Sequence, residues 1–244
     1  MGASQESPSQ GRQPEPKTDR FDALVHAVVH DLRSPLVTIE SMTGLLKESA
    51  APRLQEDELV YLGHIENAAA LMRGLLGDLS ELNLIPPTVS SRVTVRMDEL
   101  VPRLVEEMAA EIAMAKGSVA VAPGLPTVQG DPTVIEKVFR QLIDNGLKFR
   151  RPDNPPRIQI GCHTEGAVAE FRVEDNGIGV PPESRERIFG VFTKLHSRNR
   201  FPGNGIGLAL VKRGVESHGG TVTLESVPGE RTIVRFTLEP AALG

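Results

Sequence analysis

The sequence predicts an α+β fold, in which an N-terminal helical hairpin forms a dimeric four-helix bundle and is followed by an α/β sandwich. Three observations predict this fold. Apolar residues recur in alternating steps of four and three along two segments before residue 85. Short β-rich runs alternate with helical stretches after residue 90. The 244 residues also provide enough chain for two modest domains with a real hydrophobic core.

The composition excludes several classes of protein. The formal net charge is −5 and no long basic run occurs, so binding to nucleic acid or to an anionic membrane surface is disfavoured. The single cysteine, Cys162, has no partner within the chain, and the N-terminus has no apolar segment that could serve as a signal peptide. Nothing approaches the roughly 18 consecutive apolar residues of a membrane-spanning helix. We therefore expect a cytoplasmic protein without direct membrane insertion.

Residues 1–18 are expected to form a disordered tail. They are rich in Ser, Gln, Pro, Gly and charged residues, and such a segment buries too little apolar surface to offset the entropy lost on ordering. We place the helical hairpin at residues 19–85 and the sandwich at residues 90–240. The boundary between them lies near residues 84–92.

Two long helices are predicted from heptad stripes, whose members occupy positions a and d of a coiled coil. The first stripe consists of Phe21, Val25, Val28, Leu32, Pro35, Ile39, Met42 and Leu46. The second, which follows the linker SAAPRLQ, consists of Leu62, Ile65, Ala69, Met72, Leu76 and Leu79. We expect the two helices to pack as an antiparallel hairpin.

An isolated hairpin would leave much of both stripes exposed to water. Two copies of the chain that close a four-helix bundle would bury them, so we expect a homodimer. In the alternative arrangement, the chain stays a monomer and packs the hairpin on its own second domain.

The second domain is predicted from β-rich runs interleaved with helical stretches. The expected strands are VTVRM, SVAVAP, RIQIGCH, AEFRVED and TVTLES, and the expected helices lie near residues 98–115, 131–150 and 205–218. No opening strand is followed by the glycine pattern of a dinucleotide site or a P-loop, so a doubly wound nucleotide fold is disfavoured.

His30 is a candidate catalytic residue on the first predicted helix. With the stripe at positions a and d, His30 falls at position f, farthest from the seam, and its imidazole is expected to face solvent. A lone helical histidine is most often a solvated surface residue, but the neighbours favour a function. Asp31 follows it directly, and Pro35 removes a backbone donor within the helix, which costs about 3 kcal/mol. Sequences tolerate such strain mainly where function needs it.

Residues 30–36, HDLRSPL, resemble the H-box of the sensor histidine kinases of two-component systems. The resemblance implies that His30 accepts a phosphoryl group, and a neutral imidazole is indeed a nucleophile near pH 7. It further implies that Asp31 is the base that accepts the ring proton. At the position of Ser34 the family places a water that hydrolyses the phosphorylated partner, so a reverse phosphatase activity is also implied.

Residues 140–149, RQLIDNGLKF, resemble the N-box of the same family, a helix whose polar face lies on the nucleotide. Gln141, Asn145 and Lys148 are three or four residues apart and therefore share one helix face. The resemblance implies that Asn145 binds Mg²⁺ through its amide oxygen, with Gln141 beside it in the catalytic metal site, and that Lys148 meets a phosphate. Taken alone, this segment could be the polar face of a surface helix.

Residues 175–179, DNGIG, match the first glycine box of the family. The match implies that Asp175 accepts a hydrogen from the adenine amino group, while Gly177 and Gly179 allow the backbone to pass beneath the base. An Asn-Gly hairpin turn is the structural alternative for this fragment.

Two later segments resemble the remaining boxes in the family's order. IFGVF at residues 188–192 resembles the F-box and implies a nucleotide contact for Phe192, and GNGIGLA at residues 203–209 resembles the second glycine box. Glycines directly before a helix leave free N–H groups at its positive end, which suits a triphosphate. The residues implied in this cradle are Gly203, Gly205, Gly207 and Leu208.

The resemblance covers residues 20 to about 240 and implies a Bergerat-type ATP-binding sandwich with ATP and Mg²⁺ as cofactors. Residues 194–198, KLHSR, resemble the phytochrome-related branch and are expected to belong to a mobile lid over the nucleotide. Two positions depart from the family pattern. Gln141 stands where Asn is usual, and residues 228–232, PGERT, lack a second glycine. Because Gln keeps the amide and adds one methylene, we expect the metal geometry to shift and catalysis to be slow.

Together the motifs predict an ATP-dependent protein histidine kinase that autophosphorylates on His30 and passes the phosphoryl group to an aspartate of a response regulator receiver domain. Since no sensor domain is recognisable, we expect input from an upstream sensor protein through contacts at the tail or the bundle. Two alternatives stay open. The chain could be a phosphotransfer and docking module whose sandwich no longer binds ATP, or an ATPase or serine kinase of the same fold whose turnover is independent of His30.

Overall fold

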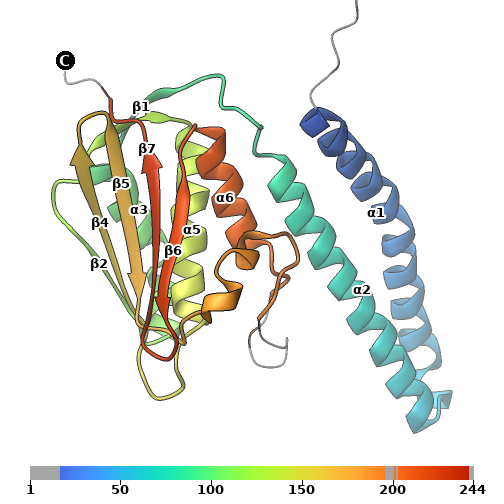
Figure 1. Ribbon diagram of the computed structural model, residues 1–244. Coiled ribbons are helices and arrows are strands. Elements are labelled where there is room, and N and C mark those ends of the chain that lie inside the picture. Colours follow the sequence, from blue (N-terminus) through green and yellow to red (C-terminus); the bar gives the residue numbers. More distant parts are fainter. Residues whose placement is uncertain (1–16, 196–200, 202, 242–244) are drawn as a thin grey trace, which may run out of the picture.

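The computed structural model of the chain describes residues 17–195, 201 and 203–241, and consists of a helical hairpin beside a sheet covered by helices (Figure 1). The hairpin comprises α1 (Lys17–Ala50) and α2 (Glu56–Asn83), joined through the 3-10 helix η1 (Ala51–Arg53). The predicted hairpin and the α+β fold are therefore confirmed. Of the predicted tail, residues 1–16 lie outside the described residues, whereas Lys17 and Thr18 belong to α1.

The two long helices run antiparallel, and polar contacts between them fix their register. Lys47 Nζ lies 2.7 Å from Glu66 Oε2 near the linker, and Arg33 donates to Ser80 Oγ at 3.5 Å toward the other end. His30 therefore lies on α1 beside the C-terminal part of α2. None of the described helices is both long and apolar enough to cross a membrane.

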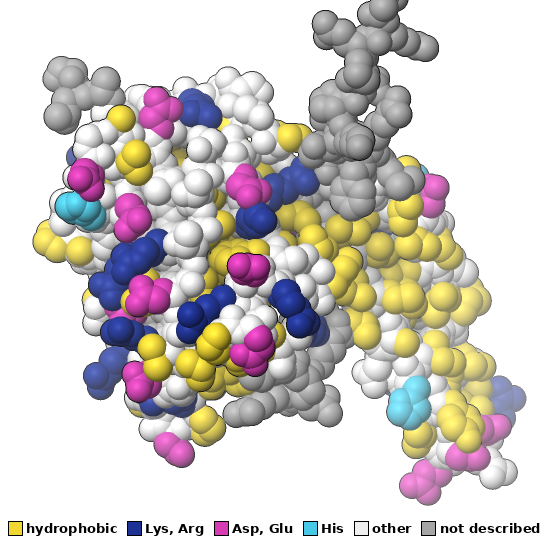
Figure 2. Space-filling view, viewed as in Figure 1, with side chains coloured by type: hydrophobic (Ala, Val, Ile, Leu, Met, Phe, Trp, Pro, Cys, Tyr) yellow, Lys and Arg dark blue, Asp and Glu magenta, His cyan; other side chains and the backbone are white. Residues whose placement is uncertain are grey.

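The apolar seam between the helices differs from the predicted stripe. Among the side chains of α1 whose burial is described, those buried against α2 are Val25, Val29, Leu36 and Thr43, and of these Val25 alone belongs to the stripe. Exposed members of the stripe are Val28, Leu32, Pro35, Ile39, Met42 and Leu46, while the side chain of Phe21 lies outside the described part. At about 100° per residue the two sets are about 75° apart around the helix. One apolar face thus packs on α2, and a second stays uncovered in a single chain. Figure 2 shows apolar side chains gathered over the hairpin.

The second part of the chain contains two sheets. A two-stranded sheet pairs β1 (Val93–Arg96) with β3 (Thr127–Gly130). A five-stranded sheet has the order β2-β4-β5-β7-β6, in which only β2 and β4 are parallel. Its strands are β2 (Ser118–Val121), β4 (Arg157–Glu165), β5 (Val168–Asp175), β6 (Val222–Val227) and β7 (Arg231–Leu238). The five predicted strands are all present, whereas β3 and β7 were not predicted.

Helices cover one face of the five-stranded sheet (Figure 1). They are α3 (Met97–Glu107), α4 (Ala109–Met114), α5 (Pro132–Lys148) and α6 (Gly207–Ser217), and the short 3-10 helices η2 (Pro182–Ser184) and η3 (Arg187–Phe189) follow β5. The single helix predicted at residues 98–115 is interrupted at Met108. The backbone there leaves helical geometry (φ −89°, ψ 9°) while the side chain stays buried.

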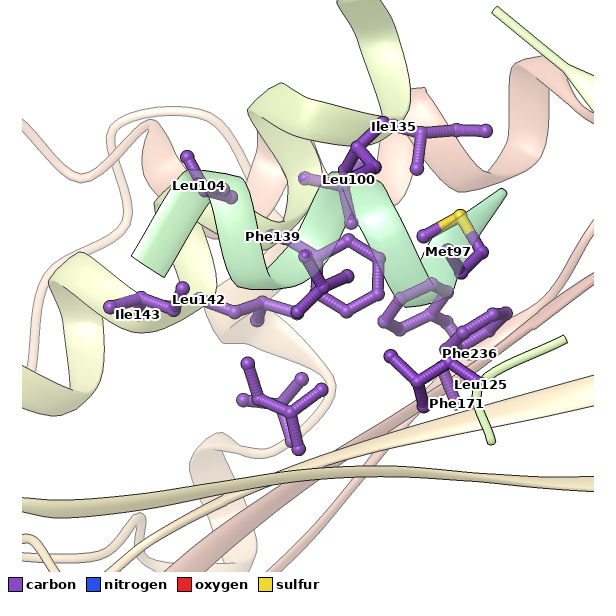
Figure 3. Close-up of a cluster of buried hydrophobic side chains, with 14 of the residues drawn as sticks. Met97, Leu100, Leu104, Leu125, Ile135, Phe139, Leu142, Ile143, Phe171 and Phe236 are labelled. Carbon is purple, nitrogen blue, oxygen red and sulfur yellow. The ribbon is translucent and has the colours of Figure 1, made fainter. Parts of the chain in front are cut away.

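Three phenylalanine rings form the centre of the sandwich core (Figure 3). The ring of Phe139 on α5 meets Phe171 of β5 and Phe236 of β7 at centroid distances of 5.6 and 5.3 Å. Edge-to-face pairs of this kind add about 0.5–1.5 kcal/mol each beyond their area burial. The core fixes the apolar face of α5 on the sheet, and this leaves other faces of α5 free to present polar side chains.

Candidate functional site

A cavity of about 300 Å³ lies between α5, the segment before α6, the sheet and the C-terminal part of α2. Its apolar lining includes Val173, Ile178, Val180, Ile188, Leu224 and Val234, and its polar lining includes Asp78, Glu81, Gln141, Asp144, Asn145, Lys148, Asp175, Thr193 and Thr232. A pocket of this composition fits a ligand that has a flat apolar part and a charged part.

The orientation of α5 about its own axis places three predicted polar residues in the wall of this cavity. The helix begins at Pro132 after the N-cap Asp131, whose carboxylate accepts from the N–H of Thr133 at 2.8 Å. Its apolar face is buried in the core, and Gln141, Asn145 and Lys148 all line the cavity, as their spacing predicts. One face of α5 therefore packs in the core, and another face forms part of the polar wall of the cavity.

The Asn145 side chain carries a buried amide nitrogen, Nδ2, with no hydrogen-bond partner among the described residues. Leaving such a group unsatisfied costs about 1–3 kcal/mol. A polar ligand bound in the cavity could accept a hydrogen bond from this Nδ2 atom.

Lys148 presents a half-buried ammonium group at the cavity. Its Nζ lies 4.9 Å from the ring centroid of Phe149 and packs against Gly203, where any side chain would collide with it. Burial lowers the pKa of Lys148, and the carboxylates of Asp144 and Asp78 act in the opposite direction. Burial likewise raises the pKa of Asp144. An anionic ligand here would stabilise the charged ammonium.

Asp175 places a carboxylate at the end of β5 inside the cavity. Burial raises its pKa to about 6, the hydrogen bond from the Gly177 N–H to Oδ1 at 2.8 Å acts to lower it, and the charge of Glu174 raises it. The group is therefore ionised at neutral pH and can accept a hydrogen bond from a ligand.

The segment 203–207 brings backbone close to the cavity directly before α6. Gly203 and Gly205 have φ of 125° and 79°, in the left-handed region that favours glycine. A Cβ on Gly205 would lie 2.5 Å from the carbonyl oxygen of Thr193, and one on Gly207 would lie 2.5 Å from Nε2 of Gln141. Residues 203–208 all line the cavity, and the first N–H groups of α6 have no partners within the helix.

Two predicted nucleotide residues are not part of the cavity wall. Gly177 is buried behind Asp175, where a Cβ would lie 2.6 Å from the carbonyl oxygen of Phe149. Phe192 is 48% exposed, with a φ of 60°, while its neighbour Thr193 does line the cavity. Of the predicted lid segment, Lys194 and Leu195 line the cavity and residues 196–198 lie outside the described part.

The turn at residues 228–232 contains a single glycine and supports the backbone of the first glycine box. Gly229 has a φ of 78°, and its N–H donates to the carbonyl oxygen of Ile178 at 2.7 Å. Arg151 donates to the carbonyl oxygen of Gly229 at 2.9 Å. The turn therefore holds the backbone of the first glycine box from below, next to Gly179, whose missing Cβ leaves room for Val227 and Pro228.

The predicted phosphoacceptor lies on the hairpin, outside the cavity. The side chains of His30 and Asp31 are both 80% exposed, and Ser34 is exposed one turn further along α1. The hairpin reaches the cavity through α2, because Asp78 and Glu81 belong to the cavity wall.

Several cavity residues were not singled out from the sequence. Asp144 and Phe149 lie inside the N-box segment, and Asn204 lies between the glycines of the second glycine box, so the motifs contained them without marking them. Asp78 and Glu81 have no signal in the sequence. Only the packing of α2 on the second domain brings them to the site.

Among the described residues, no group of three His, Cys, Asp or Glu side chains could hold a metal ion. The amide oxygens of Gln141 and Asn145 are hard donors of the kind that Mg²⁺ accepts, and Mg²⁺ commonly binds through few protein groups together with substrate phosphates. The residues present therefore fit a cation that arrives with a phosphate ligand.

Comparison with known proteins shows which families and proteins this chain resembles. The family described as histidine kinase-, DNA gyrase B-, and HSP90-like ATPase matches residues 130–242, which include every residue of the cavity wall except Asp78 and Glu81. The chain is also 34% identical over 224 residues to the methanogenesis regulatory histidine kinase FilI of Methanothrix harundinacea, across 92% of this chain and 25% of that protein. The chain is homologous to the histidine kinases.

The histidine kinase homology includes the phytochrome-like protein Cph1 of Synechocystis sp., which is 31% identical over 209 residues, across 86% of this chain and 28% of Cph1. The solved structure of full-length ShkA in complex with AMPPNP matches with a TM-score of 0.66 and 23% identity, over 91% of this chain and 47% of ShkA. These matches confirm the family resemblance and the fold predicted from the sequence. The chain spans about a quarter of the length of the two curated relatives.

Proposed function

We propose that the chain is an ATP-dependent protein histidine kinase. In this proposal ATP and Mg²⁺ bind in the cavity, the γ-phosphoryl group is transferred to His30, and an aspartate of a response regulator receiver domain then accepts it. One observation carries the proposal: the hairpin that exposes His30 also lines part of a cavity in which the buried Nδ2 atom of Asn145 has no hydrogen-bond partner among the described residues. The homology to histidine kinases and the AMPPNP complex of ShkA support it.

In this proposal, some cavity residues bind the adenine base and others bind the phosphates of ATP. Asp175 accepts a hydrogen from the adenine amino group, and the apolar lining excludes water from the base. Lys148 and the N–H groups before α6 neutralise and orient the phosphates. The side-chain amide oxygens of Asn145 and Gln141 would hold Mg²⁺, which would neutralise charge on the triphosphate.

The contact between His30 and Asp31 prepares the imidazole ring to accept the phosphoryl group. His30 Nδ1 lies 3.2 Å from Asp31 Oδ1, so an Nδ1–H donates to the carboxylate and the ring lone pair is on Nε2. The Nε2 atom forms the N–P bond while the bond from the γ-phosphorus to the bridging oxygen breaks, and ADP leaves. Asp31 then takes the Nδ1 proton, which returns the phosphorylated ring to its neutral form.

Three further parts of the proposal concern other molecules. A second copy of the chain covers the exposed stripe of α1, which gives a dimeric four-helix bundle. Ser34, exposed one turn after His30, positions water for dephosphorylation of the response regulator. An upstream sensor protein supplies the input through the hairpin.

Incubation of the full chain with γ-labelled ATP and Mg²⁺ tests the proposal. We expect acid-labile, alkali-stable label on the wild type and none on His30→Ala. We also expect Asn145→Ala to lose the label while sedimenting as the wild type does, because Asn145 lies in the cavity and far in sequence from the hairpin. ATP turnover that persists in His30→Ala would favour an ATPase or serine kinase. Wild type that binds no ATP but accepts phosphoryl groups on His30 from a phosphorylated regulator would favour the phosphotransfer module.

A further inference from the structure

The C-terminal half of α2 contacts the phosphate-side wall of the cavity. Asn204 Nδ2 donates to Asp78 Oδ2 at 2.7 Å, although the two residues are 126 positions apart in the chain. Gly74 lies one turn before Asp78, and a Cβ there would lie 3.1 Å from the same amide nitrogen. Asn204 therefore rests on two successive turns of one helix face, and the absence of a side chain at Gly74 permits the approach.

Apolar packing continues this contact along α2. Leu82, one turn after Asp78, is buried in a cluster with Ile85 and with Ile206, which lies directly before α6. Arg213 Nε of α6 donates to the carbonyl oxygen of Ile85 at 2.8 Å. The same face of α2 thus carries a polar contact at Asp78 and a buried apolar contact beyond it, so the helix is docked on the segment that leads into α6.

Asp78 brings a negative charge to groups that the proposed function assigns to phosphates. Its carboxylate lines the cavity together with Lys148, whose charged form it favours against the effect of burial. It also holds the side chain of Asn204, within the glycine segment expected to cradle the triphosphate. In the docked arrangement a carboxylate of the chain itself therefore binds the Asn204 amide and acts electrostatically on the Lys148 ammonium, the two groups that a terminal phosphate would otherwise meet.

We infer that Asp78 is a specificity-determining residue of the nucleotide site, which disfavours ATP relative to ADP while α2 is docked. Its carboxylate competes with the terminal phosphate for Asn204 and Lys148, so entry of ATP weakens the hold of segment 203–207 on α2. The inference rests on the proposed nucleotide site. ADP lacks the third phosphoryl group and its charge, so the repulsion falls mainly on ATP.

Calorimetric titration of the full chain with Mg²⁺-ATP and with Mg²⁺-ADP tests this inference. Asp78→Asn keeps the shape of the side chain and removes its charge. We expect its Kd for ATP to fall about three- to tenfold and its Kd for ADP to change less than about twofold. A purely structural role of Asp78 would shift both affinities together.

Three matched variants separate charge from contact. Glu81→Gln removes a carboxylate from the same cavity wall but keeps the bond between Asp78 and Asn204, and we expect a smaller change in the ratio of the two Kd values. Gly74→Ala crowds Asn204 without changing any charge, and we expect the ratio to shift in the same direction as in Asp78→Asn. Glu48→Gln, an exposed change near the linker, should leave the ratio unchanged.

The outcomes distinguish the inference from the proposed function. If the wild type binds both nucleotides and neither Asp78→Asn nor Gly74→Ala changes the ratio of the two Kd values, the inference is wrong and the nucleotide site stands. If the wild type binds neither nucleotide, the proposed site and the inference are both overturned.

Discussion

The Nδ1 atom of His30 lies 3.2 Å from the Oδ1 atom of Asp31, and both side chains are exposed to solvent. A carboxylate at this position favours the ring tautomer that carries its hydrogen on Nδ1. The nucleophilic lone pair is then on Nε2, and the residue that selects the tautomer is also the one that can remove the proton after attack.

Asp31→Asn should therefore slow autophosphorylation about 10²–10⁴-fold, because the ring keeps its position and loses its base. Single-turnover labelling with ATP measures the rate, and nitrogen-edited NMR of the phosphorylated wild type should place the phosphoryl group on Nε2. A phosphoryl group on Nδ1 would contradict the tautomer argued from this contact.

ATP affinity should fall as the pH falls through about 6, because burial raises the pKa of Asp175 to about that value. Above pH 6 the carboxylate is ionised and accepts the adenine amino hydrogen, and protonation removes that acceptor. Titrations with ATP between pH 5 and pH 8 measure the change. In Asp175→Asn we expect weak binding with a flatter pH profile, and an unchanged profile would show that another group titrates.

Asp175→Asn, which should weaken ATP binding, should increase the stability of the folded chain. The folded pKa of Asp175 lies above the ordinary value of 3.8, so the charged carboxylate costs the folded state stability as the pH rises from about 4 through 6. We expect Asp175→Asn to raise the free energy of unfolding at pH 7 by up to about 2–3 kcal/mol and to have little effect near pH 4. Urea denaturation at the two pH values measures this difference.

Gly205→Ala should weaken ATP binding more than Gly207→Ala does. A Cβ at Gly205 meets the fixed carbonyl oxygen of Thr193 at 2.5 Å, and its φ of 79° is strained for alanine at a cost of about 1–2 kcal/mol. A Cβ at Gly207 meets only the flexible side chain of Gln141, which can move. Nucleotide titrations of both variants make the comparison, and equal losses would contradict this reading of the glycine segment.

The fold should lose stability as the pH falls below about 6.5, through His218. The pKa of His218 is lowered, chiefly by burial and also by the charge of Arg92. The hydrogen bond to Gly214 and the charge of Asp131 act in the opposite direction. The ring is held neutral, because Nδ1 faces the carbonyl oxygen of Gly214 at 2.7 Å and Nε2 accepts from the Asp131 N–H at 3.0 Å.

The unfolded chain binds the His218 proton more readily than the folded chain, so stability is fully present above the ordinary pKa of 6.5 and is lost as the pH falls. Urea denaturation between pH 7.5 and pH 5.5 measures the slope. His218→Gln should flatten that slope whatever its own stability at pH 7.5, and an equal slope in the variant would exclude His218 as its source.

Leu32→Glu should dissociate the proposed dimer, because Leu32 belongs to the exposed apolar stripe of α1. Val37→Glu is a matched control, since Val37 is 54% exposed on the same helix but lies outside the stripe, on the side of His30. Analytical ultracentrifugation should find Leu32→Glu as a monomer and Val37→Glu as a dimer. Dissociation of both variants, or of neither, would contradict the stripe as the dimer interface.

The features predicted correctly from the sequence are those that local spacing decides. Gln141, Asn145 and Lys148 share the cavity face of α5 because an α-helix repeats every 3.6 residues, and the exposure of His30 follows from its place relative to the apolar positions. The strand β7 was not predicted, although its burial alternates: Val234, Phe236 and Leu238 are buried, and the side chains between them are polar and make polar contacts. Arg235, for example, pairs with Glu170 and Glu225.

The seam of the hairpin shows where local spacing becomes ambiguous. Two apolar faces about 75° apart both satisfy a heptad pattern, and only the packing of α1 on α2 shows that Val29 and Leu36 belong to the inner face. Phe192 shows the same limit for a motif. Ile188 of the F-box and the adjacent Thr193 line the cavity, whereas Phe192, with a φ of 60°, is not part of its wall.

The α+β fold, the exposure of His30 and the polar face of α5 could be predicted from local patterns, since each depends on residues close together in the chain. Three features of the site follow only from tertiary packing. Asp78 of the hairpin accepts a hydrogen bond from Asn204 of the glycine segment, the buried Nδ2 atom of Asn145 has no partner among the described residues, and burial raises the pKa of Asp175. These depend on which distant segments exclude water from a group, and no periodicity in the chain encodes that.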